Sequence, residues 1–150
     1  MKKILYLIAA IFIFVSPTLA GDLVNVSGAS GIALNGYDPV AFFTESKPTH
    51  GDPKITATHK GATYMFASES HKKKFEQNPE KYAPQYGGYC AYGVSVGALF
   101  PVDINTWQVR NQKLYLNLNP KILKLFNQDI EGYITKADMN WPDLARKNQM

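Results

Sequence analysis

The sequence predicts a small α+β domain, in which an antiparallel sheet built from hairpins packs against short helices. Two pairs of segments alternate apolar and polar residues, as half-buried strands do, and a short turn signal joins each pair. Asp38-Pro39 and Asn119-Pro120 combine a capping residue with proline at the first helical position, which is typical of helix starts. The chain has one cysteine, so no internal disulfide can form and a packed core must stabilise the fold.

The first twenty residues predict a secretory signal peptide. A basic start is followed by an unbroken apolar run over residues 4–15, which is short for a membrane span. Thr18 and Ala20 are small residues at the positions that a signal peptidase reads, so we expect cleavage before Gly21. Residues 21–150 are then expected to form one domain with no stable membrane anchor, located in the periplasm or secreted.

The charge and the motifs exclude several function classes. The formal net charge is +4, and Lys2 and Lys3 of the signal peptide supply two of these charges. The remaining excess is too small to indicate nucleic-acid binding. No HExxH, paired CxxC, GxSxG, GxGxxG or phosphate-binding loop occurs in the sequence. We therefore name no catalytic residue, and the sequence favours a non-enzymatic protein.

Four elements are expected in the first half of the domain. In chain order they are a strand over residues 32–34, a helix from Asp38 to Phe43, an antiparallel hairpin over residues 55–66, and a helix from Ser68 to about Gln77. Lys60-Gly61 supplies the turn of the hairpin. The Ser68 side chain can cap the helix that follows it.

The second half is expected to mix helices with one more hairpin. In chain order it holds a helical turn from Pro79 to Tyr82, an irregular glycine- and tyrosine-rich segment over residues 84–97, a hairpin over residues 107–118, a helix from Asn119-Pro120 whose apolar face extends to Ile134, and a short helix after residues 140–142.

Cys90 and the tyrosines around it are the candidate ligand-binding residues. Cys90 could bind a metal, react, or fill a tight place, and we expect it to be buried because unpaired cysteine is among the most buried residue types. Tyrosines among glycines can line a small-molecule pocket with rings and hydroxyls. We name Tyr64, Tyr89 and Tyr92, together with Cys90, as candidate ligand contacts.

Several motifs resemble those of the YHS-domain family. They are NGYDPVAFF at residues 35–43, GATYMFAS at residues 61–68 and FEQNPEKYAPQYGGYCA at residues 75–91. KLYLNL and ADMNWP, at residues 113–118 and 137–142, further resemble the C-terminal extension of exported, periplasmic bacterial YHS-domain proteins. The resemblance implies a YHS-type domain with its core at about residues 32–92 and an extension over residues 93–150.

The resemblance also implies metal binding through cysteines, with copper as the metal it suggests. At the positions of those cysteines this sequence has Ala41, Ala67 and His71, so that His71 alone keeps a donor atom. Thiolates suit copper(I), and imidazoles suit zinc or copper(II). We therefore name His71 and Cys90 as candidate metal ligands, although Cys90 lies outside the positions of the family's cysteines.

Three functional hypotheses remain open. The first, which the sequence favours, is an exported non-enzymatic YHS-domain protein that binds copper or zinc or has an accessory role. The second is a small-molecule binding module that uses the tyrosine- and glycine-rich segment. The third is a thiol-dependent redox protein centred on Cys90. The first requires a further donor near Cys90, the second a pocket beside the tyrosines, and the third an exposed thiol with a cationic neighbour.

Overall fold

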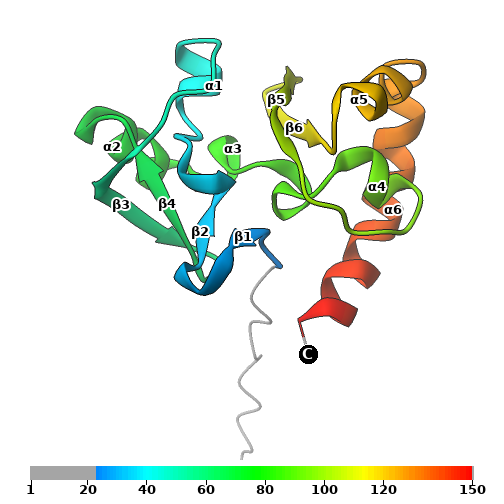
Figure 1. Ribbon diagram of the computed structural model, residues 1–150, viewed down its shortest axis with the longest axis horizontal. Helices are drawn as coiled ribbons and strands as arrows, with labels where there is room; N and C mark the ends of the chain where they lie inside the picture. Colours follow the sequence, from blue (N-terminus) through cyan, green and yellow to red (C-terminus); the bar gives the residue numbers. More distant parts are fainter. Residues whose placement is uncertain (1–22, 150) are drawn as a thin grey trace, which may run out of the picture.

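The computed structural model describes residues 23–149, and the predicted signal peptide lies outside this range. Figure 1 shows two halves side by side, which we call the N-terminal and C-terminal halves. No helix in residues 23–149 is long and apolar enough to span a bilayer. The α+β fold class predicted from the sequence is confirmed.

The N-terminal half is built around a four-stranded sheet with the strand order β1-β2-β4-β3. Its elements are β1 (Val26–Ser27), η1 (Gly28–Ser30), β2 (Ile32–Ala33), η2 (Leu34–Gly36), α1 (Ala41–Thr44), β3 (Asp52–His59), β4 (Ala62–Phe66), α2 (Glu69–Gln77) and α3 (Pro79–Tyr82). The predicted hairpin is present as β3 and β4, which pair antiparallel. The sheet is mixed and not wholly antiparallel, because β2 runs parallel to β4.

The C-terminal half contains a two-stranded hairpin and three α-helices among its described residues. Its elements are η3 (Gln85–Gly88), α4 (Ala91–Ser95), β5 (Asp103–Arg110), β6 (Lys113–Asn117), α5 (Pro120–Phe126) and α6 (Ile130–Asn148). The predicted second hairpin is therefore confirmed, and it is separate from the four-stranded sheet.

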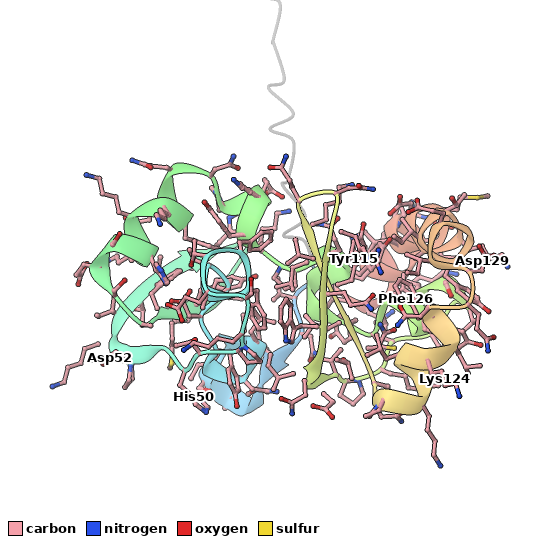
Figure 2. All side chains as sticks on the ribbon, turned by 90° about the horizontal axis from the view of Figure 1, so that it is seen from above. His50, Asp52, Tyr115, Lys124, Phe126 and Asp129 are labelled. Carbon is pink, nitrogen blue, oxygen red and sulfur yellow. The ribbon has the colours of Figure 1, made fainter. Side chains whose placement is uncertain are left out.

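Strand β6 divides the hydrophobic interior into two clusters. Leu114 and Leu116 belong to the core of the N-terminal half, whereas Tyr115 belongs to the core of the C-terminal half. Successive side chains of a strand point to opposite faces, which explains this division. Tyr115 packs near Phe126, with 6.3 Å between the ring centroids (Figure 2). Strand β6 is thus buried on both faces and contacts the cores of both halves.

Two predictions about the last helices are wrong. The apolar stripe that suggested one helix from Asn119 to Ile134 is split between α5 and α6, and the Asp129 side chain caps α6 by accepting the N–H of Gly132. The short helix predicted after residues 140–142 is the second part of α6, which continues through Pro142. The irregular segment over residues 84–97 also contains the short helix α4, with Cys90 at its N-cap.

Candidate functional site

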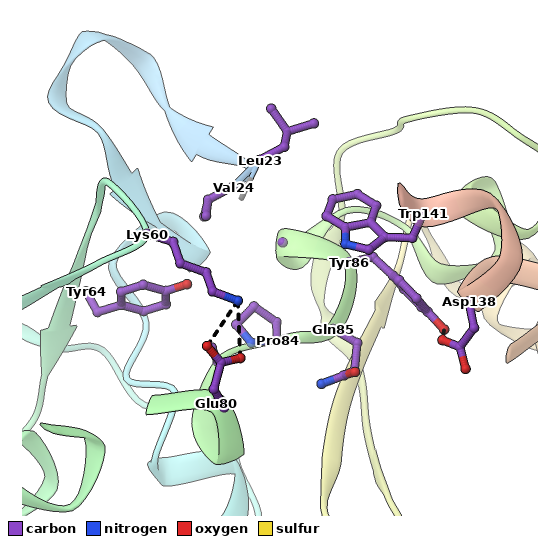
Figure 3. A pocket seen from close by; sticks show the side chains of 12 residues that line it. Leu23, Val24, Lys60, Tyr64, Glu80, Pro84, Gln85, Tyr86, Asp138 and Trp141 are labelled. Carbon is purple, nitrogen blue, oxygen red and sulfur yellow. Dashed lines mark hydrogen bonds and ion pairs between the residues drawn. The ribbon is translucent and has the colours of Figure 1, made fainter. Parts of the chain in front are cut away.

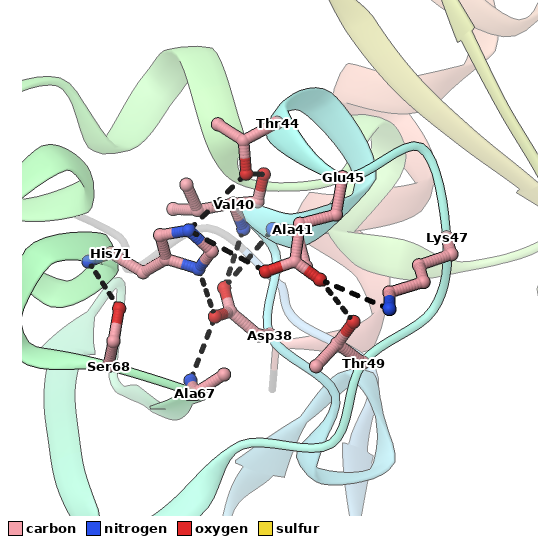
Figure 4. A network of polar contacts seen from close by, with 10 residues as sticks. All are labelled: Asp38, Val40, Ala41, Thr44, Glu45, Lys47, Thr49, Ala67, Ser68 and His71. Carbon is pink, nitrogen blue, oxygen red and sulfur yellow. Dashed lines mark hydrogen bonds and ion pairs between the residues drawn. The ribbon is translucent and has the colours of Figure 1, made fainter.

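The carboxylate of Asp38 is the centre of a buried polar network in the N-terminal half (Figure 4). Asp38 is fully buried. Its Oδ1 accepts the N–H of Val40 at 2.8 Å and that of Ala41 at 3.4 Å. Its Oδ2 accepts the N–H of Ala67 at 2.8 Å and lies 2.6 Å from Nδ1 of His71. Both oxygens are therefore engaged, as burial of a carboxylate requires.

The second ring nitrogen of His71 also has polar neighbours. Its Nε2 lies 3.3 Å from the hydroxyl oxygen of Thr44 and 3.9 Å from Oε1 of Glu45, both near the end of α1 (Figure 4). His71 itself is on α2, whose start is capped by the Ser68 hydroxyl. The imidazole therefore connects α1 to α2.

The positions of the family's cysteines do come together in this network, but the residues there do not fit a thiolate metal site. Ala41, Ala67 and His71 all contact the Asp38 carboxylate, the first two through their backbone N–H groups. Methyl side chains supply no donor, and both oxygens of Asp38 already accept hydrogen bonds. Among residues 23–149 no group of three or more His, Cys, Asp or Glu side chains is placed to hold a metal ion.

Cys90 forms the corresponding buried centre in the C-terminal half. Its exposed fraction is 0%, which confirms the expected burial. The sulfur accepts the N–H groups of Gly93 and Leu118, each at 3.3 Å, and the thiol donates to Oδ1 of Asn117 at 3.7 Å. Burial raises the pKa of the thiol, and the backbone hydrogen bonds offset only part of this effect. Cys90 is therefore a protonated, enclosed thiol.

The two candidate metal ligands are not brought together. The contacts of His71 and those of Cys90 have no residue in common. Helix α2 and helix α4 lie in different halves of the molecule (Figure 1). Copper or zinc binding by either residue stays a prediction, and the arrangement does not fit a site that uses both.

A cavity of about 170 Å³ lies between the two halves (Figure 3). Its walls come from residues 23–25 before β1, which we call the lead-in segment, and from the β3–β4 turn, β4, the segment from α3 to η3, and α6. The lining residues are Leu23, Val24, Lys60, Tyr64, Glu80, Ala83, Pro84, Gln85, Tyr86, Gly87, Asp138 and Trp141.

Gly87 allows the lead-in segment to form one wall of this cavity. A Cβ at Gly87 would lie 2.0 Å from the carbonyl oxygen of Leu23, and the φ angle of +59° also disfavours a side chain. The close approach is held by a hydrogen bond from the N–H of Asn25 to the carbonyl of Gly87 at 2.8 Å. Leu23 and Val24 are thereby placed at the cavity.

The N-terminal wall of the cavity combines an ion pair with a buried hydroxyl. Nζ of Lys60 lies 3.1 and 3.2 Å from the two carboxylate oxygens of Glu80. Tyr64 is only 1% exposed, and its hydroxyl points into this space (Figure 3). Within residues 23–149 no hydrogen bond of that hydroxyl is found. Burial and the charge of Glu80 raise the pKa of Tyr64, so the phenol is neutral.

The opposite wall combines aromatic rings with a second carboxylate. The Tyr86 hydroxyl donates to Oδ1 of Asp138 at 2.8 Å. Burial and this hydrogen bond raise the pKa of Tyr86. The rings of Tyr86 and Trp141 have centroids 6.0 Å apart (Figure 3). Asp138 and Trp141 are three positions apart in α6, so they share one face of that helix.

The cavity includes only one of the predicted ligand contacts. Tyr64 lines it, whereas Tyr89, Tyr92 and Cys90 are not among its lining residues. Tyr89 packs near Trp141, and Tyr92 packs against Tyr133. No sequence pattern pointed to Glu80, Gln85, Asp138 or Trp141 as ligand contacts. The tyrosine- and glycine-rich segment was predicted to line a pocket, but only the fold shows that Tyr86 is the tyrosine of this segment that lines the cavity and donates to Asp138.

Comparison with protein families locates one known domain. Residues 43–86 match the family model of the YHS domain. The chain contains a YHS domain. The matched segment begins in α1 and ends at Tyr86, so the cavity joins the YHS domain to α6 outside it. No curated protein and no solved structure matches the chain.

Proposed function

We propose that this chain is a YHS-domain protein that binds a small polar organic molecule in the cavity between the YHS domain and α6. The cavity itself is the observation that supports this function. Small-ligand sites are concave, are lined by aromatic and apolar side chains, and contain a few converging polar groups. Tyr86 and Trp141 supply the rings, and Tyr64 supplies a buried hydroxyl whose hydrogen-bonding capacity is unused within residues 23–149.

The geometry favours this function over the two alternatives. A reactive thiol needs solvent access and a lowered pKa, whereas burial raises the pKa of Cys90 and encloses its sulfur. Metal binding through the family's positions would need donors that Ala41 and Ala67 lack. The cavity, by contrast, supplies both space and polar groups without any rearrangement.

The experiment is a ligand screen on the mature chain that begins at Gly21. Thermal unfolding would be followed in the presence of a library of small metabolites, and calorimetric titration would check each compound that raises the melting temperature. A ligand at a hundred times its Kd stabilises the folded state by about 2.7 kcal/mol, which such a screen detects readily. A library that contains no stabilising compound would contradict the proposal.

A filling variant tests whether the cavity is the binding site. Gln85→Trp places a large ring into the lining, whereas Gln77→Trp makes the same change on the exposed end of α2, outside the cavity. We expect Gln85→Trp to abolish binding and Gln77→Trp to leave it unchanged, with both variants folded by circular dichroism. Equal binding by the two variants would place the site elsewhere.

We also propose that the protein acts outside the cytoplasm, because residues 1–20 have the three-part layout of a signal peptide. The full chain would be expressed in a Gram-negative host, and the osmotic-shock fraction would be analysed by mass spectrometry. The expected mass is that of a chain starting at Gly21. A chain recovered only with Met1 in the cytoplasmic fraction would contradict export.

A further inference from the structure

The charges on the cavity walls are unequal. Two carboxylates, Glu80 and Asp138, line the cavity with one ammonium group, that of Lys60. Lys60 is already paired with Glu80, at 3.1 Å. His59 also contacts Glu80, with 3.3 Å between its Nε2 and the Glu80 carboxylate. Asp138 has no ion pair within residues 23–149, and its one hydrogen-bond partner there is the Tyr86 hydroxyl. The C-terminal wall therefore presents a carboxylate without a countercharge in the described chain.

The phenols around the cavity experience this negative charge. Asp138 contributes to raising the pKa of Tyr86, after burial. Tyr115 lies beside Tyr86 and does not line the cavity, and burial and the charges of Asp138 and Glu131 raise its pKa to about 12. On the other wall Glu80 has the same effect on Tyr64. A negative potential at these positions would favour a cationic ligand over an anionic one.

The aromatic lining has the same preference. The faces of indole and phenol rings attract cations through the ring quadrupole, and tryptophan does so most strongly. Trp141 and Tyr86 stand at 63° to one another with 6.0 Å between centroids, so the two rings form a corner beside Asp138 (Figure 3). Such a corner can hold the apolar carbons next to a charged nitrogen.

The buried hydroxyl of Tyr64 supplies an independent indication of a ligand. The side chain is 1% exposed, yet its hydroxyl has no hydrogen bond within residues 23–149. The hydroxyl oxygen opens onto the cavity, so its hydrogen-bonding capacity is available to a ligand there (Figure 3). The phenolic oxygen can accept a hydrogen bond from a polar group of a ligand in this cavity.

We infer that the ligand is a small organic cation, an amine or a quaternary ammonium with a short apolar body. This inference rests on the proposed function and narrows its ligand class. A cavity of about 170 Å³ is close in size to the ~150 Å³ cavity that holds a benzene molecule, so the ligand has on the order of five to ten non-hydrogen atoms. The positive group lies towards Asp138 and the rings, and the apolar body lies against Leu23 and Val24.

The test compares probes of matched size and different charge. n-Butylamine, which is protonated at pH 7, butyramide and butyrate would be titrated calorimetrically into the mature chain, together with tetramethylammonium. We expect n-butylamine to bind about tenfold or more tightly than butyramide, and butyrate to bind most weakly. The preference for n-butylamine over butyramide should decrease as the salt concentration rises, because salt screens the attraction between solvent-accessible charges.

Two matched variants on α6 test the role of the carboxylate. Asp138→Asn keeps the shape of the wall but removes its charge, whereas Asp143→Asn removes a charge from an exposed position that is not part of this cavity. We expect Asp138→Asn to weaken n-butylamine binding about tenfold to a hundredfold and to leave butyramide binding nearly unchanged. Asp143→Asn should bind both probes as the parent protein does.

The outcomes separate this inference from the proposed function. Two results would show that the cavity is a binding site but that its ligand is not a cation. In the first, butyramide or butyrate binds as tightly as n-butylamine. In the second, the metabolite screen yields only neutral or anionic ligands whose binding Gln85→Trp blocks. If neither the probes nor the screen shows any binding, both proposals are overturned. An unchanged affinity of Asp138→Asn for n-butylamine would also overturn the cation assignment.

Discussion

The two halves of the molecule each have one fully buried polar centre, and the two centres differ in charge. In the N-terminal half the Asp38 carboxylate receives three backbone N–H groups and faces the His71 imidazole. In the C-terminal half the Cys90 thiol receives two backbone N–H groups and donates to Asn117. A carboxylate must replace far more hydration than a thiol does, which explains the larger set of donors around Asp38.

The two cores differ from the boundary between them in how far their polar groups are hydrogen-bonded to the protein itself. Asp38 and Cys90 are the residues of the two cores whose side chains could bind a metal or react. Both are already engaged in hydrogen bonds that stabilise the fold. The boundary between the halves differs, because there Tyr64 and Asp138 face a cavity. A candidate ligand site is therefore better supported at the boundary than in either core.

The largest expected effect comes from removing the charged centre. Asp38→Ala should lower the free energy of unfolding by about 3–5 kcal/mol, because several buried donors lose their acceptor. Asp52→Ala is the matched control: Asp52 is exposed and accepts the N–H of Lys54 at 2.8 Å, so a loss within about 0.5 kcal/mol is expected. Denaturant unfolding of the mature chain measures both. Equal losses in the two variants would show that the Asp38 network does not stabilise the fold.

Removing the neutral centre should have a smaller effect. Cys90→Ala should cost about 1–3 kcal/mol in the same measurement, because the N–H groups of Gly93 and Leu118 lose a weak acceptor and a small void remains. In the parent protein, iodoacetamide should modify Cys90 only after the chain is unfolded in denaturant. Alkylation of the native protein at the rate of the unfolded chain would contradict the enclosed thiol and reopen the redox hypothesis.

The smallest effect is expected from alkaline pH acting on the tyrosines near the boundary. The pKa of Tyr115 is raised to about 12 from an ordinary value of 10.0, so the folded protein retains a proton that the unfolded chain loses. Stability due to this shift is fully present below pH 10 and is lost as the pH rises towards 12, by up to about 1.4 kcal/mol per pH unit. Denaturant unfolding between pH 8 and 11 should show this decline, and Tyr115→Phe should make it shallower. An identical slope in Tyr115→Phe would contradict the assignment.

Much of the local structure could be predicted from single short signals. Ser68 caps α2 as expected, and the residues Lys60 and Gly61 form the turn between β3 and β4 with positive φ angles. Asn119 caps α5, with Pro120 at its start. Each of these signals acts through backbone groups within three or four residues, so no knowledge of the fold is needed.

Two of the errors arose where distant contacts override local signals, whereas the missed start of α6 rests on a local signal, the Asp129 cap. Pro142 suggested a helix start, yet α6 runs through it, and contacts with other elements hold the helix in the turn before the proline. The Asp138 carboxylate is tied to the Tyr86 hydroxyl, and the Asn140 amide donates to the carbonyls of Val94 and Ser95. The parallel pairing of β2 with β4 was likewise invisible, since nothing in two short strands specifies their direction.

The sequence by itself determined the α+β class, the positions of most turns and caps, and the absence of thiols at positions 41, 67 and 71. Only the tertiary structure decided that these positions converge on Asp38, that Cys90 pairs with Asn117, and that Tyr86 meets Asp138 beside a cavity. These pairs are separated by 33, 27 and 52 residues for Asp38–His71, Cys90–Asn117 and Tyr86–Asp138. Local patterns report backbone preferences over a few residues, whereas such pairs form only when hydrophobic burial packs distant segments of the chain against one another.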